Sequence, residues 1–63
     1  MSPAVRLRLE LTEAEASLLV EMLEHKEVEL SHEIHHTKTL AMRQELEQLL
    51  DTVEGLLRKL KQA

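Results

Sequence analysis

The sequence predicts a mainly α protein, in which a short N-terminal β-strand precedes an antiparallel helical hairpin that dimerises into a four-helix bundle with a two-stranded ribbon. Three observations favour this fold class. Apolar and charged residues alternate near the N-terminus, two long segments have helical apolar spacing, and only 1 Pro and 1 Gly interrupt the 63 residues. We expect one domain, with a strand at about 4–11 and helices at about 13–35 and 39–61.

The small size of the chain favours oligomerisation. A monomer of this length hides only about 60% of the surface that its unfolded form exposes. The sequence has 0 Cys, so neither a disulfide nor a cysteine-based metal site can stabilise it, and it has no aromatic residue of the Phe, Tyr or Trp type for its core. Oligomerisation is the remaining source of stability, and we therefore expect a homodimer.

The N-terminal segment has the two-residue period of a half-buried strand. Its apolar face consists of Val5, Leu7, Leu9 and Leu11. The intervening charged residues, Arg6, Arg8 and Glu10, point to the other side. One strand cannot satisfy its own backbone hydrogen bonds, and no second strand pattern follows. We therefore expect the apolar residues to form a dimer strand, paired with the same segment of a second copy.

The first helix is predicted to begin directly after Thr12. The residues T-E-A-E at 12–15 form a capping box. In this motif the Thr12 hydroxyl accepts a hydrogen bond from the Glu15 amide, and the Glu15 carboxylate accepts one from the Thr12 amide. Apolar residues then occupy a stripe about 200° wide, which is broader than one packing partner needs. The stripe comprises Ala14, Ala16, Leu18, Leu19, Met22, Leu23, Leu30 and Ile34. We expect this helix to contact more than one neighbour.

The second helix is predicted to follow a tight turn at residues 36–39, where the apolar phase changes and Thr37 or Thr39 can cap a new helix. Its apolar residues recur at spacings of four and three, which is typical of a heptad seam. The helix seam consists of Met42, Leu46, Leu49, Val53, Leu56 and Leu60, widened by Leu50 and Leu57. Gly55 lies nearly opposite this seam, where we expect a tolerated surface position.

A set of residues around the turn and along the second helix carries a resemblance to known sequences. These residues are Glu33, Ile34, Thr37, Met42, Arg43 and Leu46, followed by Val53, Leu56, Leu57 and Leu60. In this pattern the chain resembles small uncharacterised bacterial two-helix proteins, which are leucine-rich helical hairpins of unknown function. That group has Asp-Asn after the turn threonine, whereas this chain has Lys38 and Thr39. The resemblance implies a bacterial helical hairpin and brings no activity with it.

Histidines and a glutamate form a polar stripe on the first helix. His25, Glu29, His32 and His36 are spaced by four, three and four residues, which aligns them on one side of a helix. The Glu-x-x-His spacing also occurs in carboxylate-bridged metal sites of four-helix bundles. One interpretation is therefore a zinc site in which these four residues are the candidate metal ligands. The stronger interpretation is a solvated or interface-rim role without any cofactor, and a third is a pH-responsive contact.

Arg6 and Arg8 suggest a second function class. A strand with outward arginines followed by two helices resembles the ribbon-helix-helix repressors, whose paired strands enter the major groove of DNA. The first helix lacks the break usual in those repressors, and the net charge of −4 repels nucleic acid. We therefore expect the two arginines to keep an exposed ribbon face in solution, with nucleic-acid binding as the alternative.

The remaining residues favour a protein without catalytic activity. Ser17 and Ser31 fall inside helices, and no loop offers paired amides for an oxyanion, so we expect no enzyme. No apolar run is long enough to span a membrane and no signal peptide is recognisable, which predicts a cytoplasmic location. The sequence thus predicts a structural or protein-interaction module whose first partner is a second copy, with another protein as a further candidate partner. A DNA-binding regulator and a His/Glu metal-binding bundle are the alternatives.

Overall fold

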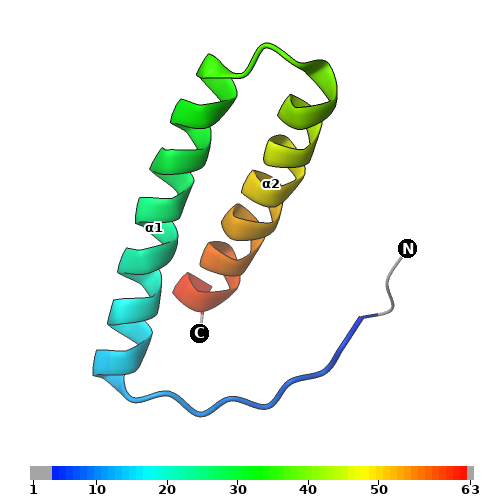
Figure 1. Cartoon of the computed structure of the whole chain (residues 1–63). Helices are drawn as coiled ribbons and strands as arrows, with labels where there is room; N and C mark the ends of the chain where they lie inside the picture. The colour runs from blue at the N-terminus through cyan, green and yellow to red at the C-terminus, as the bar shows by residue number, and fades with distance from the viewer. Residues whose placement is uncertain (1–3, 63) are drawn as a thin grey trace.

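The computed structural model describes residues 4–62 and consists of two α-helices that pack against each other. Helix α1 spans Glu13–His36 and helix α2 spans Leu40–Gln62. The helices run antiparallel and are joined at one end by residues 37–39 (Figure 1). The predicted mainly α hairpin is therefore present, and both helices begin and end within one residue of the expected positions.

Helix α1 begins at the predicted capping box. The backbone amide of Glu15 donates a hydrogen bond to Thr12 Oγ1 at 3.1 Å, and the amide of Thr12 donates one to Glu15 Oε1 at 2.9 Å. Thr12 itself has an extended backbone, with φ −69° and ψ 163°. Two of the free amides at the helix start are satisfied in this way, so the N-terminus of α1 is fixed by local sequence.

The connection between the helices is held by hydrogen bonds from both sides. The Thr37 hydroxyl donates to the carbonyl of Glu33 at 2.6 Å, and the Thr37 amide donates to the carbonyl of Ile34 at 3.3 Å. From α2, the Arg43 guanidinium donates to the carbonyl of Thr37 at 3.1 Å. These bonds satisfy backbone carbonyls at the end of α1, and they make the reversal of the chain tight.

The core of the hairpin lies between the two helices and is small. Leu30 of α1 is 1% exposed, and it packs with Val53 and Leu57 of α2, which are each 6% exposed. The partly buried apolar residues around them are Val20, Leu23, Leu46 and Leu50. A single layer of two helices buries only the facing side of each, so many apolar side chains have no room in this core.

Residues 4–11 form no strand in this single chain, so the structure does not support the strand predicted for Val5, Leu7, Leu9 and Leu11. Every residue of this N-terminal segment is exposed, and among the described residues no backbone hydrogen bond ties it to the helices. Its trace leaves the start of α1 and passes beyond the end of α2 (Figure 1). The physical reason is that a strand needs a second strand for its amides and carbonyls, and the hairpin offers only helices.

Candidate interaction surface

The most prominent feature of the described surface is the apolar area that the hairpin leaves uncovered. Eleven large apolar side chains of residues 4–62 are between 41% and 78% exposed. They are Val5, Leu7, Leu9, Leu11, Leu18, Met22, Val28, Leu40, Met42, Leu49 and Leu56. Isolated exposed leucines are common on proteins, but these form groups on the N-terminal segment, on α1 and on α2.

One group lies on α2 and results from a division of the predicted seam. Val53 is part of the core and Leu46 packs against it, so these two seam residues line the contact with α1, and Leu60 is half-buried. The other three, Met42, Leu49 and Leu56, are exposed, and we call them the α2 flank. Leu50 and Leu57, predicted only to widen the seam, occupy the contact instead. The observed contact is therefore rotated around α2 relative to the predicted heptad seam.

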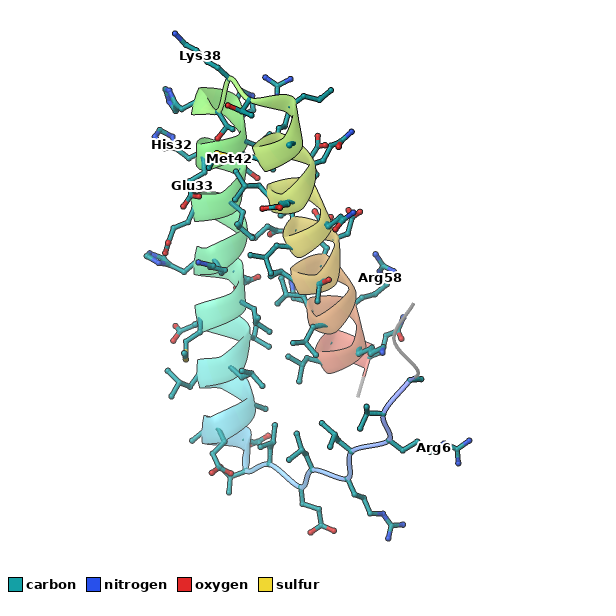
Figure 2. All side chains as sticks on the ribbon, turned by 45° about the vertical axis from the view of Figure 1, so that its right-hand side comes forward. Arg6, His32, Glu33, Lys38, Met42 and Arg58 are labelled. Carbon is teal, nitrogen blue, oxygen red and sulfur yellow. The ribbon has the colours of Figure 1, made fainter. Side chains whose placement is uncertain are left out.

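The α2 flank borders the hairpin core. At about 100° per residue, its three members lie on average about 65° to one side of the middle of the buried face of α2. They recur every seven residues, which keeps them in line along the helix. Met42 lies beside α1 close to the connection, whereas Arg58 points away from α1 (Figure 2). The flank is thus an apolar edge that continues the core outward.

A second group lies on the side of α1 that faces away from α2. Leu18 and Met22 begin a line of residues that continues at spacings of three and four through His25, Glu29, His32 and His36. We call these six residues the outer stripe of α1. The side chains of Leu18, Met22, His25 and Glu29, together with Val28, line a shallow depression on this helix. The outer stripe is therefore apolar towards the N-terminus of α1 and polar towards the connection.

The four candidate metal ligands all lie on this stripe and are exposed. They form two separate pairs, His32 with His36 and His25 with Glu29. The rings of His32 and His36 have centroids 4.4 Å apart and are tilted by 53°. His25 Nδ1 lies 3.7 Å from Glu29 Oε1. His32 points away from α2 (Figure 2), so α2 adds no ligand on its side. Among residues 4–62, no three side chains of the His, Cys, Asp or Glu type gather into a metal-binding group.

Arg6 and Arg8, the candidate nucleic-acid contacts, are exposed in the N-terminal segment. Arg6 points away from both helices (Figure 2). After this segment in the sequence, α1 continues without interruption for 24 residues, from Glu13 to His36. The two arginines therefore lie on a segment without a strand, and the first helix is a long arm of a hairpin.

Two polar contacts made by side chains of α2 were not predicted from the sequence. Arg43 reaches back to the Thr37 carbonyl, and Lys61 Nζ donates to Glu24 Oε2 at 3.0 Å across the open end of the hairpin. Both depend on which residues the folded hairpin places next to each other, so the spacing of neighbouring residues in the sequence does not indicate them. The Lys61–Glu24 ion pair is exposed, and such pairs contribute at most about 1 kcal/mol to stability.

Comparisons with known proteins add no family to this description. No protein-family model matches the chain, and no curated protein or solved structure shows significant similarity to it. The leucine-rich hairpin agrees with the architecture that the resemblance to small bacterial proteins implies, whereas membership of that group and bacterial origin stay expectations. Neither helix of the described chain has the length and apolar character that a membrane crossing requires.

Proposed function

We propose that this chain is a small non-enzymatic structural or protein-interaction module that acts as a homo-oligomer, in the first place as a homodimer. The observation that carries the proposal is the ratio of apolar residues outside and inside the hairpin. Eleven large apolar side chains of the described residues are exposed, whereas only Leu30, Val53 and Leu57 are buried. Ordered apolar surface of this kind marks sites of protein association.

The exposed area supports a second copy as the partner. The chain exposes 5916 Å². A compact monomer of 7.3 kDa is expected to expose about 4200 Å², so the excess is about 1700 Å². A stable dimer buries about 800 Å² on each partner, well within that excess. The radius of gyration of 13.7 Å also exceeds the value of about 10.6 Å expected for a compact domain of this length.

The α2 flank is the surface best suited to form a four-helix bundle. Met42, Leu49 and Leu56 border the existing core, so a second hairpin packed there extends one continuous apolar interior. The outer stripe of α1 is less suited, because His25 and Glu29 interrupt it after Met22 and would be desolvated. In this dimer the two N-terminal segments form the antiparallel ribbon that a single chain cannot make.

The distribution of reactive side chains supports a non-enzymatic role. The sequence has no cysteine, and Ser17 and Ser31 lie within α1. The histidines of the outer stripe stand on an exposed helix surface and not in an enclosed pocket. Covalent acyl transfer needs a nucleophile, a base and an oxyanion-stabilising group within reach of one another, and both described serines lie inside a helix without a loop of paired amides beside them. The dimer is proposed to act by binding, to itself and then to another protein.

Sedimentation of the full chain tests the homodimer. We expect a dimer at micromolar concentration, and we expect the double variant Leu49→Gln with Leu56→Gln to sediment as a monomer with its helix content retained. The matched control is Leu18→Gln with Met22→Gln, which removes apolar groups that are even more exposed from α1 and should leave the dimer intact. A parent chain that sediments as a monomer contradicts the proposal. A dimer lost equally in both double variants contradicts the assignment to the α2 flank.

A gel-shift assay distinguishes the binding module from a DNA-binding regulator. Ribbon binding to DNA includes contacts to phosphates, so it should appear with bulk DNA at low salt and disappear as salt is added. The net charge of −4 opposes such binding, and we expect no shift. A salt-sensitive shift that Arg6→Ala with Arg8→Ala abolishes would replace the proposed function with the regulator.

A further inference from the structure

The alternating apolar and charged residues of the N-terminal segment restrict how two copies of it can pair. Val5, Leu7, Leu9 and Leu11 alternate with Arg6, Arg8 and Glu10, and all of them are exposed in the single chain. Thr12, which follows them, already has an extended backbone as the cap of α1. An extended segment can therefore continue to the first residue of the helix without any change at the cap.

Symmetry and the apolar face restrict the possible registers. Two identical antiparallel strands are related by a two-fold axis that passes through, or between, residues of the segment. If the axis passes between residues, odd positions face even ones, and each leucine lies opposite a charged residue. Only an axis through a residue keeps the apolar side chains of both strands on one face. Within the alternating segment, the central candidates are Leu7, Arg8, Leu9 and Glu10.

The charges then select one of these four axes. With the axis at Leu7, Arg6 lies opposite Arg8 twice. With the axis at Arg8, Arg6 lies opposite Glu10 twice, but Arg8 lies opposite its own copy, so one like-charge pair remains. With the axis at Glu10, that residue lies opposite its own copy and no opposite charges face each other. With the axis at Leu9, Arg8 lies opposite Glu10 of the second copy, and this happens twice. Like charges directly opposite destabilise a strand pair and opposite charges stabilise it.

We propose that residues 6–12 of two copies pair as antiparallel strands about an axis at Leu9, with Arg8 of each copy facing Glu10 of the other. The partner is a second copy of this chain, and the inference rests on the proposed homodimer. Leu9 faces its own copy and Leu7 faces Leu11 on the apolar side of the ribbon. The charges along the ribbon thus set its register, while the leucines cover the exposed apolar surface of the helices.

A pair of charge variants tests this register. Arg8→Glu places Glu against Glu twice in the proposed dimer, and Glu10→Arg places Arg against Arg twice. We expect each variant alone to raise the dissociation constant about tenfold. An equimolar mixture of the two restores two opposite-charge pairs, so it should form a heterodimer within about threefold of the parent affinity. Sedimentation equilibrium of each variant and of the mixture, at one salt concentration, measures the three affinities.

Cysteine substitution supplies an independent measurement, since the sequence contains 0 Cys. Leu7→Cys, Arg8→Cys, Leu9→Cys and Glu10→Cys are oxidised separately and the cross-linked dimer is followed on non-reducing gels. A residue on the axis lies opposite its own copy at a Cβ separation of about 4.5–5.5 Å, close to what a disulfide requires. We expect Leu9→Cys to cross-link about tenfold faster than the other three, because their copies are offset along the strand.

The outcomes separate this inference from the proposed function. If the parent is a dimer but both charge variants dimerise as well as the parent, the ribbon register is wrong and the homodimer stands. Faster cross-linking at residue 7, 8 or 10 than at Leu9 likewise overturns only the register. If the parent is a monomer, the proposed function itself fails. A dimer whose affinity is lowered by each charge variant and recovered in the mixture supports both.

Discussion

The two helices of the hairpin use their apolar residues differently. In α2 they gather on one broad side, where the residues buried against α1 and the exposed α2 flank are neighbours. In α1 they divide between two opposite sides, because Leu30 faces the core while Leu18 and Met22 begin the outer stripe. The contact that forms the hairpin is thus narrower than the apolar surface of either helix. The exposed apolar residues of α2 border the core, whereas those of α1 lie on the side of the helix that faces away from the core.

The largest expected effect contrasts the two sides of α1. Leu30→Asp introduces a charge at a position that is 1% exposed and should reduce the free energy of unfolding by about 3–5 kcal/mol, enough to unfold a chain of this size. Met22→Asp on the outer stripe should change it by no more than about 0.5 kcal/mol. Urea denaturation followed by circular dichroism measures both. Equal losses from the two variants would show that the sides of α1 are equivalent.

Two threonines in different settings test how far local bonds stabilise each helix. Thr12→Ala removes the cap of α1 and should cost about 1 kcal/mol of unfolding free energy. Thr52→Ala in α2 removes a hydroxyl that donates to the carbonyl of Gln48 at 3.1 Å, a bond within the helix that adds little, and should be neutral or slightly stabilising. Thermal unfolding of both variants provides the comparison. A Thr12→Ala variant as stable as the parent would contradict the capping role.

Gly55 offers a gain in stability on α2. It lies within the helix, has no positive φ, and a Cβ built on it meets nothing within 4 Å. Gly55→Ala should therefore raise the unfolding free energy by about 0.8–1 kcal/mol. Ala41→Gly, an exposed change in the opposite direction, should lower it by less than this amount, because Ala41 lies in the first turn of α2 and not in its interior. A destabilised Gly55→Ala variant would indicate that a partner approaches α2 closely at this residue.

The smallest expected effect concerns the polar half of the outer stripe. His32→Gln with His36→Gln should change the unfolding free energy by no more than about 0.5 kcal/mol, since both side chains are exposed. Zinc at about 10 µM should leave the melting temperature of the parent unchanged. If zinc raises the melting temperature of the parent but not of the double variant, the two imidazoles bind the metal, and the outer stripe is a metal site.

The sequence predicted those features that depend on neighbouring residues. The capping box of Thr12 and Glu15 was correct because both partners lie within one helical turn. The division of the seam was not foreseen, since heptad spacing gives the apolar side of α2 but leaves its rotation open when Leu50 and Leu57 adjoin it. Whether residues 4–11 become a strand depends on a second chain. The Arg43 bond to Thr37 depends on the path of the turn.

The short connection at residues 37–39 has a consequence for the order of assembly. Closing a short loop costs little conformational entropy, and helical hairpins with mainly local contacts fold within microseconds to milliseconds. Meeting a second copy is a bimolecular event whose rate falls with dilution. In the proposed homodimer, each newly made chain folds its hairpin first and exposes its leucines until a partner arrives. The lifetime of that intermediate, and with it the exposure to aggregation and proteolysis, is set by the abundance of the protein in the cell.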